Sequence, residues 1–216
     1  MNNILKTFRQ LVPEIIAEKL RKANYNLHTK GKVARILKEK SKVYLEIGAG
    51  KKMGENEWVT LDINKDCDLF WDLRYGIPFP DKSVEMIYSS HLFEHLTFQQ
   101  TAALLKECKR VLVPGGVFSI CVPNARLYLE AYVKRDKEFW TSKPSYWEPG
   151  FNNTTIIDYV NYVAYMDWEH KYMFDEENLI YILTMNGFKD AKLRDFDSAL
   201  DLPDRQHESI YVSAIS

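Results

Sequence analysis

The chain has 216 residues, of which 46% are hydrophobic and 27% charged, and its net charge is −1. These values are ordinary for a globular protein that buries a core, and they give no overall positive field for nucleic acid. The sequence lacks an apolar run of roughly 18 residues and an amino-terminal signal pattern, so we expect no membrane span and a cytoplasmic location. Cys67, Cys108 and Cys121 have no metal-like spacing, which fits a reducing compartment.

Apolar spacing predicts an alternation of helices and strands along the chain. The expected elements are helices near 3–22 and 30–40, strands at 43–48, 58–62, 67–71 and 83–90, a helix at 97–112, a strand at 117–122, a helix at 175–186, and strands at 189–196 and 209–215. Such alternation favours a mostly parallel sheet. The links after the first two strands are shorter than the about 10–12 residues of a helical crossover, so the first crossover should be a mere turn. Pro13 should kink or split the first helix.

The amino-terminal segment is basic. Residues 1–42 hold eleven Lys and Arg against three Glu, a local net charge of +8. Because its apolar residues follow helical spacing, we expect a helix packed on the domain with a solvated basic face. The alternative is a contact between this helix and anionic lipid, or a lipid-linked substrate, at a membrane surface.

The most informative stretch is 43–50, a strand that ends in a glycine turn, followed by a second strand that ends at Asp62. Glycines such as Gly48 and Gly50 let the backbone approach a ligand closely. A carboxylate at the tip of the next strand can accept hydrogen bonds from ribose hydroxyls. The pattern indicates an adenosine-containing cofactor without specifying which one.

Further motifs follow in a fixed order, and together they resemble class I S-adenosylmethionine-dependent methyltransferases. They are Leu45-Glu46-Ile47-Gly48-Ala49-Gly50, Asp62, Asp72-Leu73, and the segments 77–85, 91–96 and 109–116. The segments 170–175 and 205–212 extend the likeness to a compact subgroup of predicted methyltransferases associated with surface-polysaccharide gene clusters. That subgroup is also similar in having a shortened segment after the first glycine loop.

The resemblance implies an α/β, Rossmann-like sheet, mostly parallel with an antiparallel C-terminal strand, flanked by helices on both faces and with a shortened first crossover. It implies one domain, 1–216. Its parts would be a helical cap at 1–42, a cofactor-binding core at 43–123, an aromatic-rich substrate segment at 124–174, and a closing helix with strands at 175–216.

The resemblance also implies S-adenosyl-L-methionine as the cofactor. The residues expected to bind it are Glu46, Gly48, Ala49, Gly50, Asp62, Ile63, Asp72, Leu73, Ser89 and His91. Asp62 would hold the ribose hydroxyls, and Asp72 the adenine amino group. The third glycine common in this family is absent, and Met53 and Gly54 occupy that region, which leaves weakened affinity or dependence on a partner open.

The acceptor is expected to be a small molecule or a saccharide precursor. Thirteen of the 29 aromatic residues fall between positions 128 and 174, where Trp140, Tyr146, Trp147 and Trp168 could stack on a ring. Asn152 to Thr155 should cap a following helix. An oxygen acceptor needs a base, and His91 and His170 are the candidate catalytic residues.

Three other interpretations use the same residues. A nicotinamide dinucleotide site would need a third glycine in the loop and an acidic residue about 20 positions after it. The third glycine is absent and Asp62 comes too early in the sequence, which disfavours this site. The spacing His91-x-x-Glu94-His95 matches an inverted zinc-protease helix. Because no further ligand cluster accompanies it, we expect no metal and a capping or loop role for Glu94 and His95. The remaining alternative is a catalytically degenerate methyltransferase fold that binds or regulates a partner, which the shortened loop would suit.

Overall fold

The computed structural model describes residues 14–136, 138–139 and 155–216, and in this part of the chain seven strands form one sheet in the order β3-β2-β1-β4-β5-β7-β6. The strands are β1 (Tyr44–Ile47), β2 (Trp58–Asp62), β3 (Leu69–Phe70), β4 (Val84–Ser90), β5 (Leu112–Pro123), β6 (Lys189–Leu193) and β7 (Ser209–Ile215). β7 runs antiparallel to both of its neighbours, and the other pairs are parallel. This confirms the expected sheet with its antiparallel C-terminal strand.

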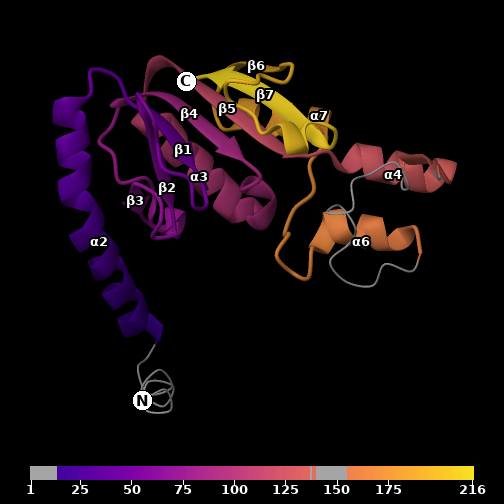
Figure 1. The fold of residues 1–216 in the computed structure, drawn as a ribbon, viewed down its shortest axis with the longest axis horizontal. Helices are drawn as coiled ribbons and strands as arrows, with labels where there is room; N and C mark the ends of the chain where they lie inside the picture. The colour runs from indigo at the N-terminus through magenta and orange to yellow at the C-terminus, as the bar shows by residue number, and fades with distance from the viewer. Residues whose placement is uncertain (1–13, 137, 140–154) are drawn as a thin grey trace.

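Helices lie around the sheet (Figure 1). They are α2 (Glu14–Glu39), α3 (Phe98–Val111), α4 (Ala125–Lys134), α6 (Ile157–Tyr165) and α7 (Glu176–Met185), with single 3-10 turns η1 (Leu73–Tyr75), η2 (Phe93–His95) and η4 (Pro203–Arg205). α2 runs along the β3 edge, and α4 and α6 form a pair at the opposite end (Figure 1). Among the described helices, none combines the length and the apolar character that a membrane crossing requires.

α2 corrects the expected pair of separate helices near 3–22 and 30–40. It continues without a break from 14 to 39, and residues 1–13, which include Pro13, lie outside the described part. Tertiary contacts hold its middle turns against β3: the Tyr25 ring lies 4.7 Å from that of Phe70, and Thr29 donates to the Phe70 carbonyl at 2.7 Å. Packing therefore outweighs the weak helix propensity of the residues between positions 22 and 30.

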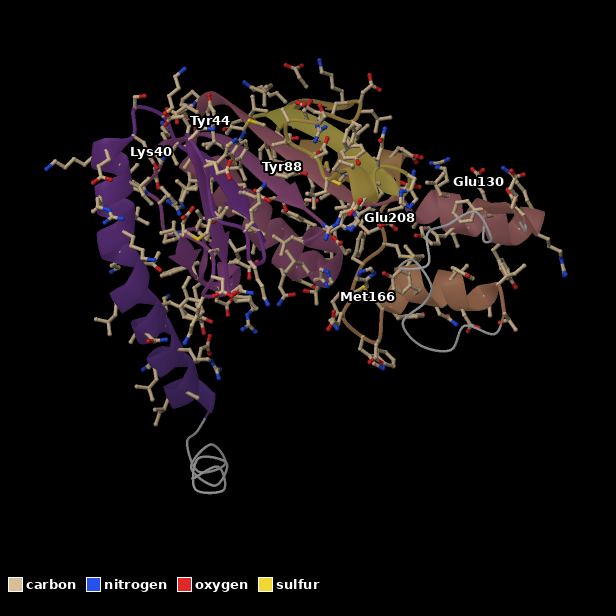
Figure 2. The ribbon with its side chains drawn as sticks, viewed as in Figure 1. Lys40, Tyr44, Tyr88, Glu130, Met166 and Glu208 are labelled. Atoms are coloured by element: carbon tan, nitrogen blue, oxygen red, sulfur yellow. The ribbon has the colours of Figure 1, made fainter. Side chains whose placement is uncertain are left out.

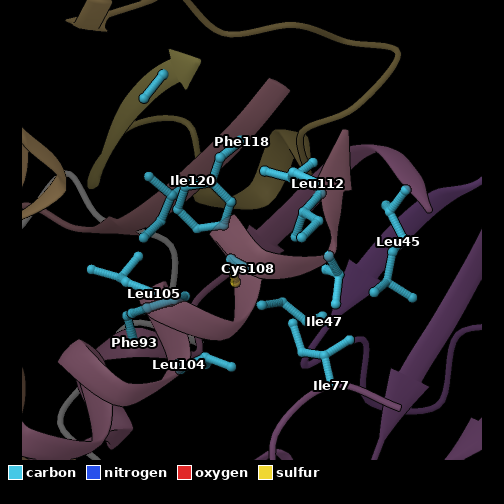
Figure 3. Packing of buried hydrophobic residues seen from close by; sticks show 14 of the residues in the cluster. Leu45, Ile47, Ile77, Phe93, Leu104, Leu105, Cys108, Leu112, Phe118 and Ile120 are labelled. Carbon is cyan, nitrogen blue, oxygen red and sulfur yellow. The ribbon is translucent and has the colours of Figure 1, made fainter. Parts of the chain in front are cut away.

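The core lies between the sheet and α3. Alternate side chains of the strands point to this face and meet the apolar stripe of α3 (Figure 3). They are Leu45, Ile47, Ile87, Phe118 and Ile120 on the strands, and Leu104, Leu105, Cys108 and Val111 on the helix. α3 begins in a capping box, in which Thr97 and Gln100 each accept a hydrogen bond from the other's backbone N–H.

A second, smaller cluster joins α4 to α6 through Tyr128, Ala131 and Val163. α4 was not among the elements expected from the sequence, although Asn124 caps it by accepting from the Arg126 N–H. α6 is the helix expected after the run 152–155, and its N-cap is Ile156, which makes no side-chain capping hydrogen bond. The residues of their contact are aromatic or small, so the aromatic density of this segment is in part a packing requirement.

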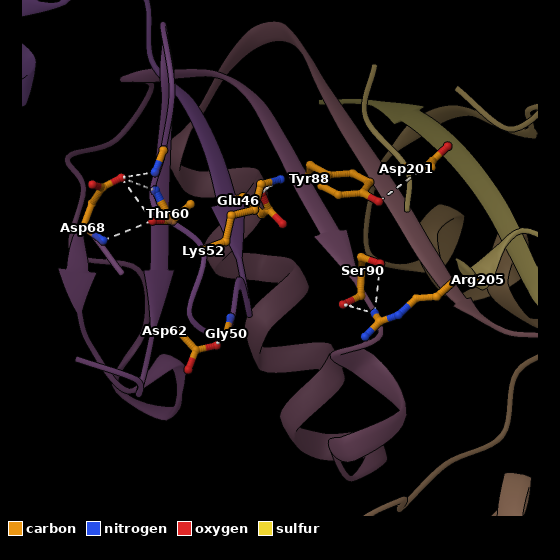
Figure 4. A network of polar contacts seen from close by, with 11 residues as sticks. Glu46, Gly50, Lys52, Thr60, Asp62, Asp68, Tyr88, Ser90, Asp201 and Arg205 are labelled. Carbon is orange, nitrogen blue, oxygen red and sulfur yellow. Dashed lines mark hydrogen bonds and ion pairs between the residues drawn. The ribbon is translucent and has the colours of Figure 1, made fainter. Parts of the chain in front are cut away.

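The link from β1 to β2 confirms the shortened crossover, because the ten described residues 48–57 contain no helix. The Asp68 carboxylate fixes this link: its Oδ2 accepts from the Gly54 N–H at 3.0 Å, from the Thr60 N–H at 2.9 Å and from the Thr60 hydroxyl at 3.0 Å (Figure 4). Gly54 leaves no room for a side chain, since an added Cβ would lie 2.3 Å from the Trp58 carbonyl oxygen.

The segment 194–208, between β6 and β7, covers part of the sheet face opposite α3. Arg194 pairs with the buried Asp201, whose carboxylate also accepts from the Tyr88 hydroxyl at 3.0 Å. Arg194 donates further to the Ser119 hydroxyl at 3.0 Å. Tyr88 of β4 and Ser119 of β5 therefore find hydrogen-bond partners in this segment, and Figure 4 shows the contact of Tyr88 with Asp201.

Three strands differ from the expected ranges by more than one residue at an end, and one of them, β6, ends at Leu193 instead of 196. β5 begins at Leu112 instead of 117, because pairing with β4 jumps from Leu112 to Val117 and the intervening residues form a bulge that includes Gly115 at φ 82°. β3 is reduced to two residues, which pair with the end of β2. The helix before the bulge ends at Val111, as Pro114 and the two glycines after it predict.

We predict that Asp68→Ala lowers the free energy of unfolding by at least about 2 kcal/mol, because three donors lose a charged acceptor. Chemical denaturation measures the loss. Asp66→Ala is the matched control: Asp66 is exposed on the same turn, and its substitution should stay within about 0.5 kcal/mol of the original protein. Equal stability of the two variants would contradict the role given to Asp68.

Candidate functional site

A cavity of about 620 Å³ opens at the carboxyl ends of β1 and β2. Its size fits a small organic ligand, and the carboxyl edge of the sheet is where open α/β folds bind ligands. The lining includes five of the residues predicted to bind the cofactor, which are Gly48, Asp62, Ile63, Asp72 and Leu73. Apolar residues of η2 and α3 form the facing wall, among them Leu92, Leu96 and Leu104.

Asp62 is oriented by the glycine loop. Its Oδ2 accepts from the Gly50 N–H at 2.9 Å, and its Oδ1 accepts from the Asn64 N–H at 2.8 Å (Figure 4). Because a carboxylate has about four acceptor positions, two remain for ligand hydroxyls. The glycine turn and the acid therefore form one unit, in which Gly50 adopts φ 63° and sets the direction of the carboxylate.

Asp72 lies at the floor of the cavity and is only 3% exposed. Its carboxylate caps η1 by accepting from the Arg74 N–H at 3.0 Å, and it forms an ion pair with the Arg74 side chain at 2.6 Å. Hydrogen bonding to Asp72 raises the pKa of Arg74 above its usual range. Asp72 is therefore an acceptor that its own turn holds in place just after β3.

The other predicted cofactor residues, Glu46, Ala49, Gly50, Ser89 and His91, are not among the lining residues of this cavity. Glu46 forms an ion pair with Lys52 at 2.7 Å on the sheet face opposite α3. The hydroxyl of Ser89 is buried without a hydrogen-bond partner among the described residues. Direct cofactor contact by these residues stays a prediction.

The sequence predicts that a ligand approaches the backbone at Gly48, and in the structure the side chain of Leu92 lies close to this glycine. Gly48 adopts φ 72°, and a Cβ added there would lie 2.8 Å from the Cβ of Leu92. The Leu92 side chain thus covers the glycine at the cavity wall. This contact determines how much space the loop leaves for a ligand.

A second cavity of about 280 Å³ lies beside the first, and His95 lines both. The predicted catalytic residues His91 and His170 meet here, although 78 positions separate them along the chain. Further lining residues are Glu94, Pro123, Tyr162, Val163, Met166, Asp204, Arg205 and Glu208. Figure 2 shows Met166 and Glu208 in the region between the sheet and the α4–α6 pair.

Burial makes the side chains of this cavity unusual. It holds the pKa of His91 well below its usual range, lowers the pKa of His170, and raises the pKa of Glu94 to about 8. At neutral pH, Glu94 therefore retains its proton and His91 carries only one ring proton, so their 3.5 Å contact joins neutral groups. His91 also adopts φ 51°, a conformation that costs a non-glycine residue of the order of 1 kcal/mol and recurs at functional sites.

Sequence reasoning missed Arg205 and Glu208 as site residues. Arg205 donates to the Ser90 hydroxyl at 3.2 Å, and Glu208 accepts from the Tyr128 hydroxyl at 2.7 Å. The segment 205–212 contributed only to the family likeness, and no spacing signal joins it to His91. Of the predicted stacking residues, Trp168 is 76% exposed, whereas Trp140, Tyr146, Trp147 and the run 152–154 lie outside the described residues.

Comparison with known sequences adds two matches. Residues 56–120 match the family model of a methyltransferase domain. A probable S-adenosylmethionine-dependent methyltransferase of Mycolicibacterium smegmatis is 44% identical over 57 residues, which are 24% of this chain and 21% of that protein. The chain thus aligns with about a fifth of the length of the curated relative it matches.

Solved structures share the fold. A methyltransferase of Archaeoglobus fulgidus superposes with a TM-score of 0.50 at 19% identity over 94% of each chain. A methyltransferase of Mesorhizobium loti superposes with a TM-score of 0.51 at 16% identity, over 81% of this chain and 90% of the other chain. Phosphoethanolamine N-methyltransferase 2 of Haemonchus contortus superposes with a TM-score of 0.50 at 13% identity, over 86% of this chain and 52% of the other chain. Its structure was solved with S-adenosyl-L-methionine.

These likenesses establish the Rossmann-like fold of class I methyltransferases. The match of residues 56–120 to a methyltransferase domain agrees with this fold.

We predict that Gly48→Ala weakens binding of S-adenosyl-L-methionine by at least about tenfold, or about 1.4 kcal/mol. The left-handed backbone strains alanine, and the new methyl group pushes Leu92 into the cavity. Isothermal titration measures the affinity. Gly31→Ala is the control: it meets no atom within 4 Å, so it should leave affinity unchanged and stabilise α2 by about 0.5–1 kcal/mol. Full affinity in Gly48→Ala would remove Gly48 from the binding surface.

Proposed function

We propose that this protein is an S-adenosyl-L-methionine-dependent methyltransferase acting on a small-molecule or saccharide-precursor acceptor. The observation that carries the proposal is the 620 Å³ cavity with Asp62 and Asp72 at neighbouring strand ends. Both carboxylates are positioned by backbone N–H donors of their own turns, so an adenosine can bind between them without rearrangement of the sheet.

The reaction is an in-line displacement. The acceptor oxygen forms a bond to the methyl carbon while the sulfur–methyl bond breaks, and its electron pair stays on sulfur to give the thioether. The protein chiefly aligns acceptor and methyl group, which is worth up to about 7–11 kcal/mol in model reactions. The hydroxyl proton passes to a neutral imidazole, for which His91 and His170 are the candidates.

The second cavity is the proposed acceptor site. It adjoins the cofactor cavity through His95, and its lining combines carboxyl, guanidinium and imidazole groups from Asp204, Arg205, Glu208 and the histidines. Such a lining suits hydroxyl-rich acceptors, and this supports the saccharide precursor implied by the family likeness. We place the reaction in the cytoplasm, in line with three free, buried cysteines.

A degenerate binding module remains the second candidate, and the contact of Leu92 with Gly48 favours it by narrowing the cavity beside the glycine loop. The two candidates differ in turnover. An enzyme converts the cofactor to its thioether in the presence of an acceptor, whereas a module binds it without product.

We predict that Asp62→Ala weakens the binding of S-adenosyl-L-methionine by about 1–3 kcal/mol, because a hydrogen-bond acceptor for the ligand is lost. This corresponds to a loss of affinity of roughly 5- to 150-fold. Asp66→Ala, four positions further on and exposed, should bind normally. The same proteins are then incubated with metabolite extract and cofactor carrying a deuterated methyl group. A labelled product from the original protein and not from Asp62→Ala supports the enzyme. Binding without any labelled product supports the module.

We also propose that α2 contacts an anionic membrane surface. Ile16, Leu20 and Leu27 are 49%, 62% and 84% exposed, and their spacing of four and seven residues places them on one helix face. The same helix is rich in lysine, and a basic helix with an exposed apolar stripe is typical of interfacial binding.

In this case, the protein should co-sediment with vesicles containing phosphatidylglycerol and not with phosphatidylcholine alone. The double variant Leu20→Ser and Leu27→Ser should lose most of this binding, because burial of two leucines is worth about 3–6 kcal/mol. Met185→Ser, at a residue 65% exposed on α7, is the control and should bind as the original does. Sedimentation of the double variant with the same vesicles would refute the contact.

A further inference from the structure

The second cavity holds a cluster of potential metal ligands. Glu94, His95 and His170 each offer one ligand atom, and these atoms lie within 4.8 Å of one another. Glu94 and His95 belong to η2 directly after β4, whereas His170 follows α6, so the fold brings them together from two distant segments. The rings of His95 and His170 meet edge to face at 4.9 Å between centroids.

Backbone carbonyls fix the orientation of both rings. His170 Nδ1 lies 2.8 Å from the Val163 oxygen, and His95 Nδ1 lies 3.3 Å from the Glu169 oxygen. A carbonyl oxygen only accepts, so each Nδ1 carries the proton and each Nε2 keeps its lone pair. This is the arrangement in which proteins present histidine to a metal, with the second nitrogen donating to a carbonyl.

Glu94 provides an independent observation. Its side chain is 3% exposed and lines the cavity, and neither carboxylate oxygen has a hydrogen-bond partner among the described residues. Its Oε1 lies 3.5 Å from His91 Nδ1 and 3.9 Å from His95 Nε2. A buried carboxyl group without a partner is costly, and in native proteins such a group calls for an unrecorded ligand or a functional role.

We propose that Glu94, His95 and His170 bind a divalent transition-metal ion of the zinc type. Two imidazoles and one carboxylate form a ligand set typical of open metal sites, and imidazole nitrogen selects zinc-like ions over magnesium. Around one ion with bonds of about 2.0–2.2 Å, ligand atoms lie about 3–4 Å apart. The cluster therefore needs to contract by about 1 Å to bind an ion.

Three protein ligands would leave such an ion a further coordination position, and this extends the proposed function on which this role rests. An acceptor hydroxyl bound there would lose its proton more readily, because a cation stabilises an oxyanion. His91 is the candidate to take that proton, because it lines the same cavity and is not one of the three ligands. The shared wall at His95 puts the bound oxygen beside the cofactor cavity.

Direct binding to the untagged protein tests the site. After removal of metal by a chelator, isothermal titration should show one Zn²⁺ per chain and no comparable heat with Mg²⁺. Co²⁺ should give the visible absorption of a site with nitrogen and oxygen ligands and fewer than six of them. His170→Asn and Glu94→Gln should each lower the Zn²⁺ affinity by at least about 100-fold. His207→Gln, at an exposed histidine outside the cluster, should bind as the original does.

Zn²⁺ affinity that is equal in His170→Asn, Glu94→Gln and His207→Gln would overturn the site, as would the absence of Zn²⁺ binding to the original protein. If one variant fails to fold, the other and the Co²⁺ spectrum of the original protein decide. S-adenosyl-L-methionine titrated into the metal-free protein separates the two proposals. Cofactor binding without any Zn²⁺ binding refutes the metal site alone, whereas Zn²⁺ binding without cofactor binding refutes the methyltransferase function.

Discussion

Only ten residues connect β1 to β2, and this short link decides how the sheet is covered and where its carboxylates lie. Parallel neighbours in one sheet usually join through a helix that also covers a face. Here the Asp68 carboxylate holds the link against β2, because it accepts hydrogen bonds from one donor of the link and two donors of β2. Gly54 permits the backbone to pass close to Trp58. Because the glycine loop is short, the Gly50 N–H lies close enough to donate a hydrogen bond to the Asp62 carboxylate.

Covering the sheet face opposite α3 then falls in part to the segment 194–208. Asp201 anchors it, because a carboxylate 3% exposed needs both Arg194 and the Tyr88 hydroxyl to balance its burial. The anchor has a functional consequence further along the segment, where Arg205 and Glu208 reach the second cavity. A structural ion pair on one face thus positions polar groups at the end of the sheet.

The two cavities differ in chemistry as well as in volume. The larger holds two carboxyl groups that accept hydrogen bonds from backbone donors and from Arg74, which suits a nucleoside with hydroxyl and amino donors. The smaller holds neutral imidazoles and a carboxyl group that burial keeps protonated, which suits proton transfer or a cation. His95 contributes to both walls, so a ligand in one cavity is in contact with the same side chain as a ligand in the other.

The order of the strands along the chain, the absence of a first crossover helix, and the placing of Gly48, Asp62 and Asp72 at one edge of the sheet all follow from the amino-acid sequence. These features are local: they follow from apolar period, glycine position and the length of a link. Tertiary structure alone decided that α2 is continuous, since contacts with β3 outweigh propensity. It also decided that His170 joins Glu94 and His95, because no periodicity relates residues that are 75 positions apart, and only the packing of the loop after α6 against η2 brings them together.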